Sequence, residues 1–361
     1  MILSSHVQYN GTILSDKFKL SFDAFVSSSE FEIVFIHEAV RYRYGFEALI
    51  NEVTSEWLYS QSEKPKSKEI ELYYRDKQNV DFHSSLPKVK TLFKEDLVRP
   101  NALLISVLAQ FNDQLATSLL NYFSKINTVS GLNESEFRIN TISKIKDAKQ
   151  KDRVLELLKS ADLGITDIEY LEKPDWLDIL PDSSRTFFEQ EDLSSVVTKH
   201  ILFQKENIAL GDIKFDMSKD ESHGTQKFFY FSGLIIDALE NGTPLIVDEL
   251  DSKLHPNLVC KIVSLFNSKQ SNPKNAQLIF NTHDTNLLSS GLFRRDQIWF
   301  ISKDNYGASK MYSLADFKTT EVRKNEPFED NYIKGKYGAV PYLGDFDELI
   351  NKIVSEDGKA E

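Results

Sequence analysis

The feature that most constrains the fold is the alternation of short apolar runs with helical patterns in the C-terminal part of the chain. The runs at 243–250 (TPLIVDEL), 275–284 (NAQLIFNTHD) and 296–304 (DQIWFISKD) are short and largely apolar. Residues 227–241 and 257–268 have helical spacing instead. Such runs are typical of strands buried on both faces, and strands that alternate with helices form parallel sheets. The sequence therefore predicts an α/β fold.

The residues upstream predict two further structural units. Four runs between residues 31 and 85 alternate apolar and polar residues, so we expect an antiparallel β lobe over 31–85. These runs are 31–37, 41–50, 56–61 and 69–76. From 86 to 192 the pattern changes to a helical one, which predicts a helical insertion, and apolar residues recur every three to four positions over 98–126. Residues 193–361 form the C-terminal α/β lobe, and 1–30 are hard to place.

Charge and cysteine content exclude several classes of protein. The chain has 43 Lys and Arg against 55 Asp and Glu, a net charge of −12. It lacks the overall positive field that draws proteins to nucleic acid or anionic lipid, although a local basic strip could still bind nucleic acid. The single cysteine, Cys260, excludes internal disulfides and cysteine-based zinc clusters. Without a long apolar run or a signal-peptide pattern, we expect a cytoplasmic protein with no membrane contact.

The glycines exclude one kind of nucleotide site. A phosphate-binding P-loop has the pattern G-x-x-x-x-G-K-[ST], in which two glycines lie five positions apart. None of the 14 glycines has another glycine at this spacing. Neither Gly-Lys pair, at Gly335 and Gly358, is followed by Ser or Thr. The sequence therefore contains no P-loop.

Two acidic residues end the 243–250 run. Asp248 and Glu249 follow three apolar residues, and a polar turn and a helix come next. Ligands of parallel sheets bind at the carboxyl ends of the strands, where an Asp can hold Mg²⁺ and a neighbouring Glu can polarise water. A strand end that meets solvent would show the same residues, so both interpretations stay open.

Two other motifs lie near predicted strand or helix ends. His283 follows the next apolar run and could contact a γ-phosphate, or it could be structural. Ser222 and Gly224 open the 227–241 helix, where backbone N–H groups and the helix dipole suit an anion. Ser222 alone would also suffice as an ordinary N-cap.

In this order the motifs resemble the head of an ABC-type ATPase. Residues 245–249 resemble Walker B with its catalytic Glu, Asp251 and Ser252 the D-loop, and His283 the switch histidine. Five residues resemble the signature motif, which binds nucleotide across a dimer: Ser222, Gly224, Thr225, Gln226 and Lys227.

The resemblance is specific to AAA-type ATPases of abortive-infection systems, the RloA- and AbiL-like group, whose heads are similar to those of OLD-family and SMC proteins. It covers residues 31 to 348. Beyond the 31–85 lobe and the helical insert, it is carried by six segments in order: GTQK, LIVDELDSKLHP, AQLIFNTHD, RRDQIWFISKD, YGASKMYSLADFK and GKYGAVPYLGDF. It implies a P-loop NTPase fold.

In that group a P-loop precedes the antiparallel lobe, whereas residues 1–30 resemble the stretch after the P-loop helix. We therefore expect an N-terminally truncated head. The resemblance implies that Asp248 organises Mg²⁺, Glu249 activates water, and His283 reports on the γ-phosphate. ATP and Mg²⁺ would be cofactors only if a missing segment or a partner supplies a P-loop.

The resemblance also implies a functional context. We expect an ATP-binding and ATP-hydrolysing protein of a phage-defence system, inactive alone for want of Walker A. Its heads would pair as homo- or heterodimers around ATP and would gate an effector nuclease or toxin. Two alternatives stay open. One is a scaffold that binds partners without catalysis, and the other is a metal-dependent nuclease using Asp248, Glu249, Asp251 and Asp284.

Overall fold

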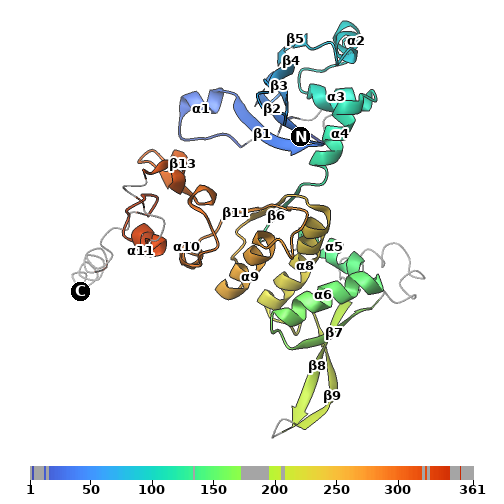
Figure 1. Cartoon of the computed structure of the whole chain (residues 1–361), viewed down its shortest axis with the longest axis vertical. Coiled ribbons are helices and arrows are strands. Elements are labelled where there is room, and N and C mark those ends of the chain that lie inside the picture. Colours follow the sequence, from blue (N-terminus) through green and yellow to red (C-terminus); the bar gives the residue numbers. More distant parts are fainter. Residues whose placement is uncertain are drawn as a thin grey trace, which may run out of the picture. The chain divides into compact units, whose positions relative to one another are not determined.

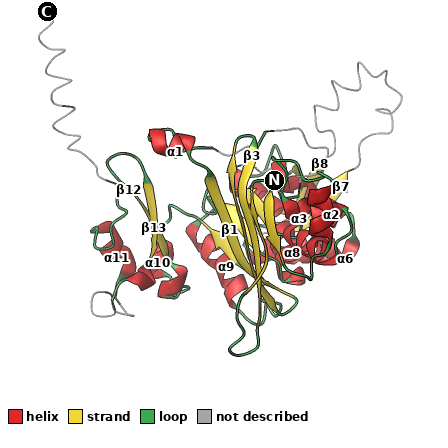
Figure 2. Cartoon of the chain, turned by 90° about the horizontal axis from the view of Figure 1, so that it is seen from above, coloured by secondary structure: helices red, strands yellow, loops and turns green. Residues whose placement is uncertain are grey.

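The computed structural model describes residues 2–3, 12–13, 16–132, 135–171, 195–204, 208–318, 322, 326–341 and 350. The chain divides into two compact units, Met1–His283 and Asp284–Glu361 (Figure 1). Strands and helices occur in both units, so the fold is mixed α/β (Figure 2). Much of the predicted 1–30 segment, residues 172–192 of the predicted insertion and residues 193–194 of the predicted C-terminal lobe lie outside the described residues.

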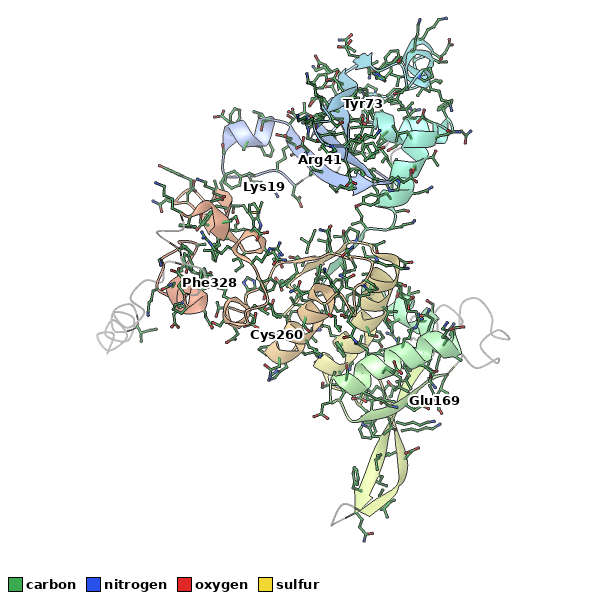
Figure 3. All side chains as sticks on the ribbon, in the orientation of Figure 1. Lys19, Arg41, Tyr73, Glu169, Cys260 and Phe328 are labelled. Carbon is green, nitrogen blue, oxygen red and sulfur yellow. The ribbon has the colours of Figure 1, made fainter. Side chains whose placement is uncertain are left out.

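The first unit begins with an antiparallel sheet whose strands pair in chain order. After the short helix α1 (Phe22–Val26), it contains β1 (Ser29–His37), β2 (Val40–Leu49), β3 (Glu52–Ser62), β4 (Ile70–Asp76) and β5 (Asn79–Phe82). The first four strands lie where the alternating pattern predicts strands. Tyr73 is one of the aromatic residues in the core of this sheet (Figure 3).

Three helices complete the core of this sheet: α2 (Lys88–Lys94), α3 (Leu104–Gln110) and α4 (Gln114–Phe123). The helical spacing over 98–126 corresponds to two separate helices, α3 and α4. Asn112 adopts a left-handed φ of 56° between them. The Asp113 carboxylate then accepts the N–H of Ala116 and caps α4. An Asp that caps a helix N-terminus competes with continuation of the preceding helix.

A three-stranded parallel sheet has the order β11–β10–β6, from β6 (Asn127–Ser130), β10 (Leu245–Asp248) and β11 (Leu278–Phe280). Strand β6 lies inside the predicted helical insertion, which is therefore not entirely helical. The prediction of burial on both faces is also wrong for the described sheet. Leu245 and Val247 are buried, whereas Ile279 on the opposite face is 53% exposed.

Helices α5 (Ser135–Ile145), α6 (Ala148–Ser160), α8 (His223–Asn241) and α9 (Pro256–Asn267) belong to the same unit (Figure 1). Helix α5 approaches α8 closely, because a Cβ at Gly233 would lie 2.3 Å from the Thr141 hydroxyl. The strands β7 (Ile165–Leu171), β8 (Ser195–Gln204) and β9 (Ile208–Asp216) form an antiparallel sheet. Lys199 pairs with Asp167 and Glu169 of β7 across this sheet.

The second unit has its own small core. It contains α10 (Asn286–Ser289), β12 (Trp299–Lys303), β13 (Ser309–Ser313), α11 (Phe328–Ile333) and two short 3₁₀ turns. The sequence predicts β12 as a strand of the parallel sheet, but β12 pairs antiparallel with β13. The turn between them, held by Asp304, returns the chain directly alongside β12.

Candidate functional site

The parallel sheet brings two predicted site segments, and the unpredicted end of β6, to one edge. Asp248 ends β10 opposite Ser130, which ends β6, and residues 281–283 follow β11. The carboxyl ends of parallel strands meet at the same edge of a sheet, where ligands bind. Asp248, Asn281 and His283 are all exposed there.

The carboxamide of Asn281 joins Asp248 to Glu249. Its Nδ2 donates a hydrogen bond to the Asp248 carboxylate, and its Oδ1 accepts the N–H of Glu249. One side chain thus orients the carboxylate at the strand end and also fixes the backbone of the next residue. Such a contact pre-orients a ligand group without blocking its other oxygen.

The backbone of Glu249 is strained. It has a left-handed φ of 54°, and Lys253 at the other side of the turn has a φ of 59°. Residues other than glycine adopt this conformation rarely, and such strain concentrates at functional sites. A Cβ at Gly131 would lie only 2.2 Å from the Glu249 carbonyl oxygen. Glycine is therefore needed at this position, where the chain after β6 passes the loop.

The first turn of α8 contacts the same loop. Ser222 is the N-cap, and its hydroxyl accepts the N–H of Thr225 at 3.1 Å. A Cβ at Gly224 would approach the Lys253 carbonyl oxygen to 2.8 Å, so glycine allows α8 to lie against the loop. Ser222 and His223 are exposed, whereas Thr225 is 7% exposed. The exposed residues of this helix start are therefore the first ones of the predicted signature motif.

The last two predicted signature residues point inward. Gln226 is 9% exposed and donates hydrogen bonds to the carbonyls of Glu221 and Ser218. Lys227 is 1% exposed, and its ammonium group donates to the carbonyls of Leu250 and Ser252. Both side chains hold the protein's own backbone, and direct contact between them and nucleotide stays a prediction.

The predicted D-loop residues link the strand ends. Ser252 Oγ donates to the Gly131 carbonyl at 2.9 Å, and it also lies 2.8 Å from Lys227 Nζ. An Asp251 carboxylate oxygen accepts the backbone N–H of His283 at 3.4 Å. These contacts place Asp251, Ser252 and His283 beside Asp248 and Glu249.

The carboxylates do not form a metal cage. Within the described residues, no group of three or more His, Cys, Asp or Glu side chains could hold a metal ion. The nuclease alternative needs such a cluster, and one of its members, Asp284, begins the second unit. Asp248 is exposed and oriented, which fits a site with one protein carboxylate and otherwise water or phosphate ligands for Mg²⁺.

Two residues that position the site are not among those selected from the sequence. Asn281 begins the run NTHD after an apolar run. An amide at one strand end, with an acid at the end of the neighbouring strand, could have indicated its role. Gly131 follows a strand that the sequence pattern does not reveal, so no local feature marks its close approach to Glu249.

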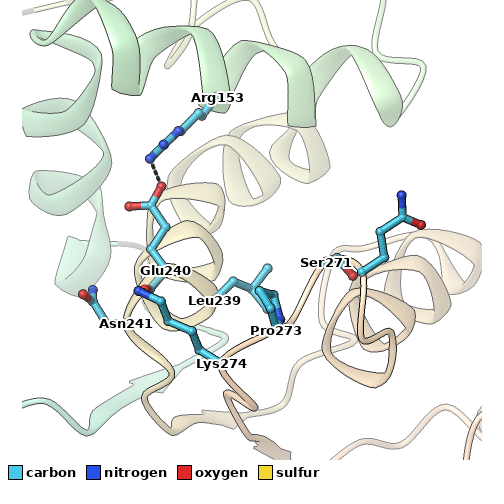
Figure 4. A pocket seen from close by; sticks show the side chains of 8 residues that line it. Arg153, Leu239, Glu240, Asn241, Ser271, Pro273 and Lys274 are labelled. Carbon is cyan, nitrogen blue, oxygen red and sulfur yellow. Dashed lines mark hydrogen bonds and ion pairs between the residues drawn. The ribbon is translucent and has the colours of Figure 1, made fainter.

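A shallow pocket lies at the opposite end of α8, and its lining includes Leu239, Glu240, Pro273 and Lys274 (Figure 4). Glu240 pairs there with Arg153, and Lys274 donates to a carbonyl. Helix α8 is 19 residues long, about 28 Å at the usual rise, so this pocket is remote from Asp248.

Among the described residues, no helix has both the length and the apolar character that crossing a membrane requires.

Comparison with known proteins places the chain in a family. No curated protein matches the sequence. The sequence profile described as "AAA domain, putative AbiEii toxin, Type IV TA system" matches residues 8–289, which is more than half of the chain. This span includes β10, β11 and the whole of the first turn of α8. The chain therefore belongs to this family of AAA domains.

Proposed function

We propose that this chain supplies the catalytic and signature sides of an ABC-like ATPase head. A phosphate-binding loop from another segment or polypeptide would complete its nucleotide site. The observation that carries the proposal is the edge of the β11–β10–β6 sheet. There Asn281 orients the exposed carboxylate of Asp248 and fixes the strained backbone of Glu249. Membership of an AAA family supports nucleotide chemistry at this edge.

The proposed roles follow from the chemistry of each side chain. Asp248 would hold Mg²⁺, directly or through water, and the ion would neutralise charge on the phosphates. Glu249 would accept a proton from the water that attacks the γ-phosphate. His283, exposed beyond β11, would donate a hydrogen bond to the same phosphate.

The start of α8 would serve a second head. Ser222, His223 and Gly224 precede or open a helix of 19 residues, whose N-terminal N–H groups and dipole favour phosphate. We propose that they bind nucleotide held by a partner in a homo- or heterodimer. The family description, with its toxin and type IV system, supports a toxin–antitoxin or phage-defence context. We propose that the nucleotide cycle gates an effector there.

A mixed-subunit ATPase assay tests this proposal. Because the sequence has no P-loop, the chain alone should bind Mg-ATP more weakly than about 10 µM in isothermal titration. Turnover by a P-loop-bearing head of the same family should rise when this chain is added. His223→Glu should abolish the rise, because a carboxylate at this helix start repels phosphate while favouring the helix itself.

The matched control places the same charge on a neighbouring helix. Asn257 is exposed in the first turn of α9, so Asn257→Glu should leave the stimulation intact. Binding of Mg-ATP by this chain alone with a Kd below about 10 µM would contradict the proposed division of the site. Stimulation that survives His223→Glu would contradict the proposed contact in trans, and absence of any stimulation would favour the scaffold alternative.

A further inference from the structure

We propose that Lys227 is a positioning residue. It fixes the loop after β10 to the first turn of α8, so that the helix start and Glu249 move as one unit. The inference rests on the proposed function, in which the start of α8 contacts nucleotide on a partner and Glu249 acts in hydrolysis. The sequence predicts Lys227 as a nucleotide contact across a dimer, whereas the proposed role lies within its own chain.

The evidence begins with the burial of the Lys227 ammonium group. The side chain is 1% exposed, yet its Nζ lies 2.6 Å from the Ser252 carbonyl and 2.8 Å from Ser252 Oγ. It lies 3.1 Å from the Leu250 carbonyl and 3.4 Å from that of Glu249. A buried ammonium group is costly unless acceptors surround it. This loop supplies those acceptors, mostly as backbone carbonyls.

The same loop is fixed from the opposite side by the chain after β6. Ser252 Oγ donates to the Gly131 carbonyl, and the Gly131 N–H donates to the Asp248 carbonyl. Lys227 and Gly131 therefore share Ser252 as a partner. The loop from Asp248 to Ser252 is thus attached both to α8 and to the end of a neighbouring strand.

Lys227 binds the part of the loop in which the backbone is strained. Its acceptors lie on the stretch from Glu249 to Ser252, and Glu249 and Lys253 are the residues of this loop with left-handed φ. A strained conformation persists only when surrounding contacts over-determine it. The Lys227 bonds supply such contacts, so their loss should let the Glu249 backbone relax. Movement of the start of α8 would also pull directly on the residues beside Glu249.

The test compares four variants of the full chain. Lys227→Met removes the donors but keeps an unbranched side chain, and Lys227→Arg keeps a donor group. Ser252→Ala removes one of the Lys227 acceptors, together with the bond from Ser252 to the Gly131 carbonyl, and is the milder variant should Lys227→Met fail to fold. Lys144→Met is the matched control, since Lys144 pairs with Asp237 nearer the other end of α8.

Two measurements separate positioning from general stability. Amide hydrogen exchange at Leu250, Ser252 and Leu254 should become about 10-fold faster in Lys227→Met and rise less in Ser252→Ala. It should stay near wild type in Lys227→Arg and Lys144→Met. In the mixed ATPase assay, Lys227→Met should lower kcat about 10-fold and change KM less than about 2-fold, because orientation and not ground-state binding is lost.

The outcomes distinguish this inference from the proposed function. If wild type stimulates turnover and Lys227→Met stimulates it equally, the positioning role is overturned while the proposed function stands. Unchanged exchange at the loop in Lys227→Met also overturns it. If wild type gives no stimulation, the proposed function fails, and so does the catalytic consequence assigned to Lys227. Faster exchange would then show a structural contact alone.

Discussion

At the scale of the residue, Glu249 combines the strained backbone of the site with its predicted catalytic carboxylate. Its left-handed φ of 54° brings the Cβ close to backbone oxygen, which costs about 1–2 kcal/mol in an L-residue. Asn281 holds its N–H, and Lys227 lies near its carbonyl. A glycine would adopt this conformation without that steric cost, but it could not accept a proton from water.

We therefore predict that Glu249→Gly is more stable than Glu249→Ala by about 1 kcal/mol. Both variants lack the carboxylate, so the difference reports the relief of the left-handed strain less the larger entropy of glycine in the unfolded chain. Urea unfolding midpoints at neutral pH measure it. Equal stability of the two variants, or a less stable Glu249→Gly, would contradict this prediction.

At the scale of the element, one carboxylate connects three strands and a helix. Glu56 of β3 is fully buried and lies 3.5 Å from the guanidinium of Arg75 on β4. It also accepts hydrogen bonds from four other groups: the hydroxyls of Tyr44 and Tyr73 and the N–H groups of Leu104 and Ile105. The N-cap residue of α3 makes no side-chain cap, so Glu56 provides the acceptor from another element.

This network predicts a dependence of stability on alkaline pH. Burial, followed by the charge of Glu56, raises the pKa of Tyr44 and Tyr73 well above 10. Near pH 10 the unfolded chain loses these protons while the folded chain keeps them. The stabilisation is thus complete below pH 10 and lost above it, by up to about 1.4 kcal/mol per pH unit for each tyrosine.

The slope of unfolding free energy against pH, measured in urea between about pH 9 and 11, checks this prediction. Tyr73→Phe should flatten it. Tyr74→Phe is the matched control, because the neighbouring Tyr74 is 39% exposed, and it should change the slope less. The prediction is contradicted if Tyr73→Phe and wild type lose stability equally with rising pH.

At the scale of the whole molecule, each unit has its own core. In the second unit, Ile298, Leu314 and Val322 are buried together with Phe300 and Tyr337. The Phe300 ring stacks on Tyr337 with centroids 5.6 Å apart. The first unit includes a separate aromatic contact between α5 and α8, where Phe137 meets Phe231. Separate cores allow the two units to unfold separately.

We predict that Phe300→Ala destabilises the second unit by about 3–5 kcal/mol and leaves the first unit folded. Amide exchange should accelerate in β12 and β13 and stay unchanged in β1–β5. Phe137→Ala, at a residue that is 1% exposed, should give the reverse pattern. If Phe300→Ala accelerated exchange equally in both units, the two would form one cooperative structure.

The sequence by itself determined much of the local structure. Alternation at 31–37 and the runs around it predict β1 to β4, and the apolar run before Asp248 predicts β10. These predictions succeed because apolar residues share one face when they recur every two positions in a strand or every three to four positions in a helix. The glycine spacing also excludes a P-loop from this sequence. The roles of Glu249 and His283 in catalysis stay predictions.

Only the tertiary structure decided which distant groups meet. Strand β6 has the sequence NTVS and no apolar run to mark it, and its pairing with β10 joins residues more than a hundred positions apart. Likewise, nothing local distinguishes a Lys227 that binds nucleotide from one that binds the backbone of Leu250 and Ser252. Periodicity reports the polarity of a face, whereas the partner of a backbone group or a buried charge depends on chain segments that only folding brings together.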